Sequence, residues 1–124
     1  FRETGDREHT NNSFVELKRT MGTDISYFSS NNDRSYTSED LSAEVLKKLK
    51  SYVIEEDVRA AVITIPMRFE QRQIDATKRA AELAGFEYSE LLQEPIAASL
   101  AYGIDKKVKN GSWLVFDFGG GTFD

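Results

Sequence analysis

Hydrophobic residues are spaced with two different periods along this chain, and the changes of period predict its elements. Short continuous apolar runs predict strands buried in a sheet, whereas apolar residues three or four positions apart predict helices. Over the second half of the chain the two patterns alternate, which predicts α/β layering with a parallel or mixed sheet. The predicted elements are a strand at 60–65, a helix at 70–84, a strand at 86–92, a helix at 95–102 and a strand at 113–118.

The first part of the chain has shorter and more polar patterns. Residues 1–13 are polar and without periodicity, which predicts a loop. Residues 14–21 form a short amphipathic stretch that predicts a helix, and two β-like runs at 25–29 and 34–37 flank a turn rich in Asn and Asp. These two runs predict a small hairpin.

A long helix is predicted at 38–54. Thr37 and Asp40 have the spacing of a capping box, in which each side chain binds the backbone N–H of the other residue. An apolar stripe follows at helical spacing and predicts the face of the helix that packs on the core. The predicted fold is therefore part of an α/β lobe at 38–124, with a mixed sheet and flanking helices, preceded by part of a small α+β subdomain at 1–37.

Composition narrows the class of protein. The chain has 124 residues, 40% of them hydrophobic and 30% charged, which suffices for one domain with a core. Its formal net charge of −5 argues against a general nucleic-acid or membrane-surface binder, because such proteins need a basic face. With no cysteine, the chain has neither disulfides nor Cys-based zinc sites. It has no starting Met and stops in a glycine-rich stretch, so we expect it to be a piece of a longer protein.

Candidate chemistry lies at the end of the last apolar run, where Asp117 follows four apolar residues. A carboxylate at the end of a buried strand is costly unless it is paired or near a cation, and a hydrated magnesium ion is a natural partner. Gly119, Gly120 and Gly121 permit φ > 0, so that successive N–H groups can converge on an anion, and Thr122 adds a hydroxyl. The alternative is a glycine-rich hairpin turn with a satisfied Asp in its first position.

Other motifs and charges change this picture only slightly. The chain contains neither G-x-x-x-x-G-K-[ST] nor G-x-G-x-x-G. The Asp-Phe-Gly triplet at 117–119 also occurs in protein kinases, but no H-R-D loop precedes it, so we interpret that match as chance. Glu94 adds a second acid at the end of a predicted strand, and ligands of α/β sheets bind beyond such ends. Lys18, taken alone, is interpreted as a solvated surface charge.

Four stretches occur in one order and together are specific for a known family. They are Leu-Ser-Ala-Glu-Val-Leu-Lys-Lys-Leu-Lys at 41–50, Ala-Val-Ile-Thr-Ile-Pro at 61–66, Glu-Pro-Ile-Ala-Ala-Ser-Leu-Ala-Tyr-Gly at 94–103 and Asp-Phe-Gly-Gly-Gly-Thr-Phe-Asp at 117–124. On these stretches the chain resembles the nucleotide-binding domain of the 70-kDa heat-shock chaperones of the bacterial DnaK type. The resemblance covers nearly the whole chain and implies a lobe of the actin-like ATPase fold, which is ribonuclease H-like.

The resemblance implies roles for single residues. Lys18 matches the lysine that helps to position the attacking water at the γ-phosphate. Glu94 matches the acid that holds the hydrated magnesium ion, and Asp117 matches the acid tied to that ion and proposed as the base. The loop at 119–122 matches the second phosphate loop, with Thr122 as the hydroxyl near the γ-phosphate. This division is sensible because phosphoryl transfer needs positioning and charge stabilisation more than covalent help.

The resemblance also implies an allosteric relay, from which this chain departs. Pro66 matches a proline that communicates with an arginine on the following helix to couple the ATP state to peptide binding. That arginine position holds Ile74 here, and Arg72, two residues away, would face differently on a helix. We therefore expect weaker coupling between ATP and peptide than in typical relatives.

The function implied by the resemblance is that of a fragment of an ATP-dependent chaperone, which uses ATP or ADP with Mg²⁺ to drive peptide binding and release. The implied partners are unfolded peptide clients, a J-domain co-chaperone and a nucleotide-exchange factor, and the implied location is the cytoplasm. Nucleic acid and membranes are not expected partners. We expect the excised chain alone to be inactive and prone to self-association. An actin-like filament or scaffold ATPase and a non-enzymatic interaction domain with a glycine hairpin stay as alternatives.

Overall fold

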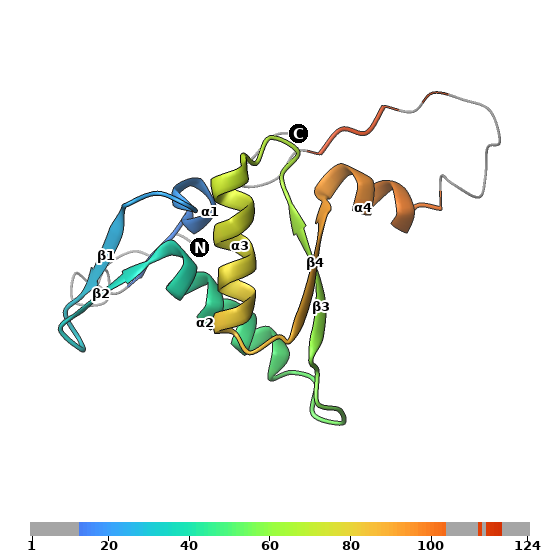
Figure 1. The fold of residues 1–124 in the computed structure, drawn as a ribbon. Helices are drawn as coiled ribbons and strands as arrows, with labels where there is room; N and C mark the ends of the chain where they lie inside the picture. The colour runs from blue at the N-terminus through green and yellow to red at the C-terminus, as the bar shows by residue number, and fades with distance from the viewer. Residues whose placement is uncertain (1–12, 104–111, 113, 118–124) are drawn as a thin grey trace, which may run out of the picture.

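The computed structural model describes residues 13–103, 112 and 114–117. The described elements follow one another as helices and strands of mixed α/β type (Figure 1). In chain order they are α1 (Leu17–Thr20), β1 (Ser26–Ser29), β2 (Arg34–Thr37), α2 (Ser38–Lys50), β3 (Ala60–Ile65), α3 (Gln71–Leu83), β4 (Tyr88–Gln93) and α4 (Glu94–Ala101).

The first two strands form the predicted hairpin. β1 and β2 pair antiparallel, with Ser26 opposite Thr37 and Ser29 opposite Arg34. In the turn between them Asp33 has a φ of 51°, a left-handed conformation that Asp tolerates better than most residues. The helix predicted at 14–21 is confirmed only as the single turn of α1. The division of the chain into subdomains at residue 37 stays a prediction.

Helix α2 begins as its sequence predicts. The Thr37 hydroxyl accepts a hydrogen bond from the Asp40 backbone N–H, and the Asp40 carboxylate accepts one from the Thr37 N–H, so the capping box is confirmed. The helix ends at Lys50 rather than at residue 54. Ser51 satisfies its last turn, because its N–H donates to the Lys47 carbonyl and its hydroxyl donates to the Lys48 carbonyl.

Helix α3 ends in a Schellman motif. Gly85 has a φ of +82°, which a residue with a side chain rarely adopts. The Gly85 N–H donates to the Glu82 carbonyl and the Phe86 N–H donates to the Ala81 carbonyl, so the last carbonyls of the helix are satisfied. This turn also brings Phe86 into the core, and β4 begins two residues later than the sequence pattern predicts.

β3 and β4 form a parallel pair, with Ala60 opposite Tyr88 and Ile65 opposite Gln93. The connection between them contains α3, as parallel pairing requires. Because the last residues of the two strands are neighbours, the segments that follow them leave the sheet at the same edge. One of these segments leads to α3 through Pro66, and the other opens α4 at Glu94.

The core lies between the sheet and two helices. Buried Ala43 of α2 and Ala81 of α3 pack with Phe86, and Ala61 and Ile63 of β3 pack against this cluster. Figure 1 shows the hairpin and the sheet on opposite sides of α2 and α3. Only alternate residues of β3 face the helices, so the other sheet face is exposed in the described residues. None of the helices described is both long and apolar enough to cross a bilayer.

The strand predicted at 113–118 is wrong for its described part. Residues 114–117 form no strand, and Leu114 is 92% exposed. An apolar run becomes a buried strand only where a neighbouring strand satisfies its backbone N–H and C=O groups. In the described part of the chain, the sheet of β3 and β4 does not extend to these residues.

Candidate functional site

Lys18 and Glu94 form an ion pair although they lie 76 residues apart in the sequence. The Lys18 Nζ contacts the Glu94 Oε1, and this contact joins α1 to the junction of β4 and α4. The Glu94 side chain is 17% exposed and the Lys18 side chain is 41% exposed. The structure therefore brings together two of the residues to which the family resemblance assigns a role in catalysis.

Local sequence explains why Glu94 lies at this point. Gln93 is the last residue of β4 and has extended backbone, and Pro95 near the start of α4 fixes a helical φ without losing a needed N–H. Glu94 thus becomes the first helical residue directly beyond a parallel strand. Its carboxylate is also favoured by the positive end of the helix dipole. An acid at this edge of an α/β sheet lies where such sheets bind ligands.

Lys18 lines an apolar hollow of about 290 Å³. Leu17, Met21 and Leu46 line this hollow together with Ile65 at the end of β3. Methylene groups of a lysine can pack along such a surface while the ammonium group reaches a polar partner. Lys18 therefore has both an apolar hollow and an acidic partner beside it, with its side chain 41% exposed.

Asp117 is not joined to this pair. In residues 13–103, 112 and 114–117, no hydrogen bond or ion pair links Asp117 to Lys18 or Glu94, and no three His, Cys, Asp or Glu side chains are grouped to hold a metal ion. Gly119, Gly120, Gly121 and Thr122 lie outside the described residues. In the described residues, the lysine and one acid of the predicted set are therefore in contact, and the second acid makes no hydrogen bond or ion pair with either.

The two residues of the predicted relay lie on either side of the turn into α3. Pro66 is buried directly after β3, and its carbonyl accepts a hydrogen bond from the Phe69 N–H. Ile74 is half-buried in the first turns of α3, and Arg72 is exposed. Arg72 lines a polar groove that Ile74 does not line, so the two side chains have different environments.

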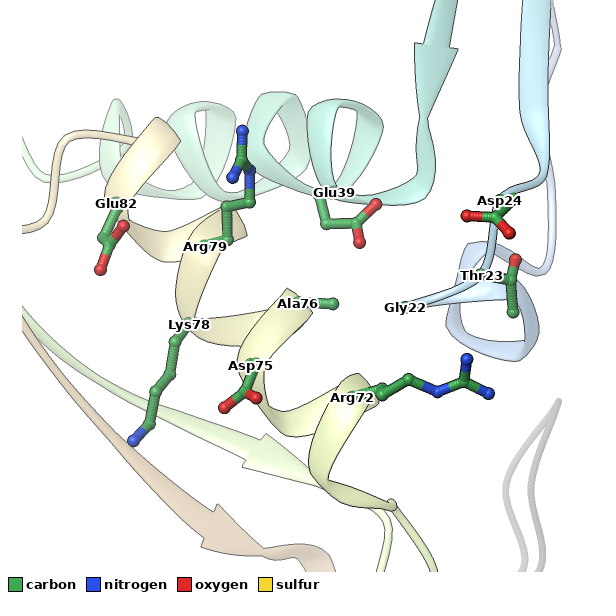
Figure 2. Close-up of a pocket in the computed structure, with 10 residues that line it drawn as sticks. All are labelled: Gly22, Thr23, Asp24, Glu39, Arg72, Asp75, Ala76, Lys78, Arg79 and Glu82. Carbon is green, nitrogen blue, oxygen red and sulfur yellow. The ribbon is translucent and has the colours of Figure 1, made fainter.

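A polar groove of about 620 Å³ lies on the other side of α3 from the sheet (Figure 2). Neither Lys18 nor Glu94 lines it. Figure 2 shows Asp24 and Thr23 of the loop after α1 facing Arg72 and Ala76 of α3, with Glu39 of α2 above them. The groove carries side chains of both signs, so it has no strong preference for an anion or a cation.

Four residues to which the sequence assigned no role, Thr20, Gly22, Tyr27 and Ser38, hold α1 in place. The Thr20 hydroxyl lies 2.7 Å from the Ser38 Oγ and 2.6 Å from the Tyr27 hydroxyl oxygen. Gly22 has a φ of +71° and lies against the backbone of α3. A glycine directly after a short amphipathic helix is the sequence signal that could have identified the turn at Gly22. Nothing in the sequence indicates the Thr20 and Ser38 contact.

Comparison with known proteins gives a consistent result. The model of the family described as Hsp70 protein matches residues 4–124. A chaperone protein DnaK of Thermosipho africanus is 50% identical over 111 residues, which are 87% of this chain and 18% of that protein. A chaperone protein DnaK of Mesomycoplasma hyopneumoniae is 44% identical over 115 residues, and one of Thermosipho melanesiensis is 43% identical over 119. These alignments cover 90% and 94% of the chain. The chain spans about a fifth of the length of these relatives.

Proposed function

Because this chain belongs to the Hsp70 family, we propose that it supplies part of the ATP-binding and ATP-hydrolysing site of a molecular chaperone. The observation that carries the proposal is the ion pair of Lys18 and Glu94. Two residues that resemblance alone assigns to nucleotide chemistry lie in contact, at the carboxyl edge of a parallel strand pair. Sequence similarity supports the family, and this contact supports the placement of the site.

The two side chains suit the charges of a nucleotide. An ammonium group carries three donors that can bind phosphate oxygens as a point charge. A carboxylate has about four acceptor positions, so one lysine contact does not saturate Glu94. Hard oxygen donors of this kind are what Mg²⁺ and its waters prefer, so Glu94 fits a role in holding a hydrated magnesium ion. When bound, that ion would neutralise charge on the phosphates during transfer.

In this proposal the residues of the chain divide the work. Lys18 would orient the attacking water at the γ-phosphate, and Glu94, paired with Lys18, would hold the hydrated magnesium ion. Asp117 would be the second acid near that ion and would act as the general base, as the family match suggests. Gly119, Gly120 and Gly121 bind phosphate oxygens through their backbone N–H groups, and Thr122 donates its hydroxyl near the γ-phosphate.

The wider function follows from the family and is proposed at the level of the whole protein. ATP binding and hydrolysis by the protein that carries this chain would drive binding and release of unfolded peptide clients. A J-domain co-chaperone and a nucleotide-exchange factor would regulate the cycle, and the cytoplasm is the proposed location. The names of the DnaK relatives support the chaperone role.

Single-turnover ATP hydrolysis by a family-length protein that carries this chain tests the proposal. Lys18→Ala and Asp117→Asn should slow hydrolysis by roughly a hundredfold or more, because each removes a charge that acts mainly in the transition state. Nucleotide affinity should change far less. Lys47→Ala is the matched control, since it removes an exposed lysine that also pairs with a glutamate, Glu44 at 2.7 Å. Hydrolysis by Lys18→Ala at the rate of Lys47→Ala would contradict the proposed site.

A further inference from the structure

The turn that follows α1 approaches the backbone of α3 more closely than any side chain would allow. A Cβ atom on Gly22 would lie 2.7 Å from the Arg72 carbonyl oxygen, 2.9 Å from the Arg72 carbonyl carbon and 3.1 Å from the Gln73 nitrogen. These atoms belong to the backbone of the first helical turn, so no rotation of a side chain can relieve the collision. Figure 2 shows the loop of Gly22 and Thr23 beside the turns of α3 that carry Arg72 and Ala76.

Other glycines with positive φ do not share this contact. A Cβ on Gly85, at φ +82°, would meet only the Lys50 Nζ at 3.8 Å, and one on Gly103, at φ +66°, would meet nothing within 4 Å. All three glycines adopt the left-handed conformation that commonly ends a helix. At Gly22 alone among these three, the missing side chain also sets how closely two elements pack.

α1 has few means of holding its own position. It has only four residues, and an isolated helix of one turn is not stable in water. Besides the Lys18–Glu94 ion pair and buried Met21, Thr20 anchors α1, because its hydroxyl lies within hydrogen-bond distance of Ser38 and Tyr27. Ser38 is 1% exposed and opens α2, so this contact fixes α1 to a buried part of the molecule. Gly22 and Thr20 thus tie α1 to α3 and α2.

The residues that anchor α1 lie near the carboxyl ends of β3 and β4, where Glu94 also lies. Ile65 and Gln93 are paired neighbours at the ends of β3 and β4. The chain passes from Ile65 to the first turn of α3, where Gly22 packs, and from Gln93 directly to Glu94. The distance of α1 from this edge therefore determines whether the Lys18 ammonium group reaches the Glu94 carboxylate.

We propose that Gly22 and Thr20 are positioning residues for Lys18, holding α1 so that its ammonium group stays at Glu94 and at the phosphate site. This inference rests on the proposed function, because Lys18 must first matter for hydrolysis. Neither residue needs to touch the nucleotide. A side chain at position 22 would push α1 away from α3 and would displace Lys18 with it.

The test measures single-turnover ATP hydrolysis and Mg-ATP affinity in a family-length protein that carries this chain. Gly22→Ala should slow hydrolysis by roughly ten- to a hundredfold, as expected when a catalytic group is displaced by about 1 Å, with little change in affinity. Gly85→Ala is the matched control, since it has the same left-handed strain without the collision. Its hydrolysis rate should stay at that of the wild type. Equal rates for Gly22→Ala and Gly85→Ala would overturn the proposal.

A second pair of variants covers the case in which Gly22→Ala does not fold. Thr20→Val keeps the shape of the side chain and removes the hydroxyl that contacts Ser38 and Tyr27. Thr20→Ser keeps the hydroxyl and removes a methyl group. Slow hydrolysis by Thr20→Val with recovery in Thr20→Ser supports the positioning role, and wild-type hydrolysis by Thr20→Val contradicts it.

Combination with Lys18→Ala separates this inference from the proposed function. If Lys18→Ala alone leaves hydrolysis unchanged, the proposed function fails. If Lys18→Ala slows hydrolysis, Thr20→Val or Gly22→Ala should add nothing in its background, because a positioning residue acts through the group that it positions. A further loss of the same size in the double variant would show that position 20 or 22 acts independently of Lys18, and would overturn the inference.

Discussion

At the scale of single residues, the two side chains of the Lys18–Glu94 ion pair differ in exposure, at 41% and 17%. A fully exposed pair contributes about 0–1 kcal/mol to stability, because water and salt screen the charges and two side chains must be ordered. With the Lys18 side chain 41% exposed, the pair is closer to that class than to a buried one. The ion pair therefore contributes little to stability and mainly positions the Lys18 ammonium group. Loss of Lys18 should affect hydrolysis much more than stability.

Ile74 leads to a prediction about coupling. An aliphatic side chain cannot make charged contacts, so the protein that carries this chain should show weaker ATP-driven peptide release than relatives with arginine at this position. Ile74→Arg should strengthen that release. The measurement is peptide affinity with ADP and with ATP. The ratio of the affinity with ADP to the affinity with ATP should rise in Ile74→Arg.

The control for this prediction is Arg72→Gln. Arg72 is exposed and lines the groove of Figure 2, so its loss should leave the ratio of the two peptide affinities unchanged. A fall of that ratio in Arg72→Gln would show that Arg72 already replaces the missing arginine. An unchanged ratio in Ile74→Arg would refute the proposed cause of the weak coupling.

At the scale of elements, the N-terminus of α2 combines a cap with a titratable group. The Thr37 backbone N–H donates to the Asp40 carboxylate at 2.9 Å and the Thr37 hydroxyl donates to the same oxygen at 2.9 Å. The first of these bonds is the largest cause that lowers the pKa of Asp40 below its ordinary value, and Arg34 and Arg79 lower it further. The carboxylate form is therefore favoured in the folded state.

The sign of the pH dependence follows from this direction. A lowered folded pKa adds stability above the unfolded value of about 3.9, and that stability is lost as the pH falls through the folded pKa. Asp40→Asn should reduce the loss of stability on acidification below about pH 4. Thr37→Ala should cost about 1 kcal/mol at neutral pH, since it removes the cap of the first turn.

Urea denaturation of the chain between neutral pH and pH 3 measures both effects. Glu39→Gln is the matched control, because it removes another carboxylate of the same first turn that is not part of the capping box. The prediction would be wrong if Asp40→Asn lost as much stability on acidification as the wild type while Glu39→Gln lost less. That result would show that Glu39, and not Asp40, causes the acid sensitivity.

The same elements show which patterns transfer from sequence to structure. The capping box of α2 is confirmed, and Gly85 after α3 and Pro95 at the start of α4 likewise act through contacts between residues a few positions apart. The end of α2 is missed by four residues, since the apolar stripe continues after Ser51 has already satisfied the last carbonyls. Val53 and Ile54 continue the pattern without being helical.

At the scale of the whole molecule, apolar surface is left open on the sheet. Val62 on the face of β3 away from the helices is 67% exposed, and Tyr88 at the start of β4 is 72% exposed. Parallel sheets are normally covered on both faces, and unpaired sheet edges promote association. In the described residues, β3 and β4 pair only with one another. Because this chain spans about a fifth of the length of its relatives, we expect other parts of a family-length protein to cover this surface.

The isolated chain should accordingly self-associate. Sedimentation velocity at increasing concentration measures this association, which Val62→Thr should weaken because it makes the open sheet face more polar while keeping a β-branched side chain. Ile54→Thr is the control, since Ile54 is more exposed, at 89%, but lies outside the sheet. Equal effects of the two variants would show that association does not use the sheet face.

The isolated chain should also bind Mg-ATP weakly. Two or three charge-assisted hydrogen bonds, each worth roughly 1.5–3 kcal/mol, are offset largely by the entropy lost when the groups that make them are ordered. An affinity of about 1 mM corresponds to only ~4 kcal/mol, and binding should be no tighter than that. Titration calorimetry with Mg-ATP checks the prediction, and a micromolar Kd that is lost in Asp117→Asn would contradict it.

The sequence by itself determined the local structure of this protein. Helices satisfy their backbone groups within one segment, and their caps and apolar spacing lie within a few residues, so α2, α3 and α4 could be placed from the sequence. The hairpin of β1 and β2 could also be predicted because its strands are separated by a short turn. The family resemblance added the candidate residues, but not their arrangement.

Only the tertiary structure decided which of these residues meet. The contact of Lys18 with Glu94 spans 76 residues, and the close approach of Gly22 to Arg72 depends on how α1 packs on α3. The described part of the run at 113–118 shows the converse, because its apolar residues have the pattern of a strand and form none. A strand needs hydrogen-bond partners from another segment, and an ion pair needs a neighbour brought by the fold, so neither can be read from the composition of its own segment.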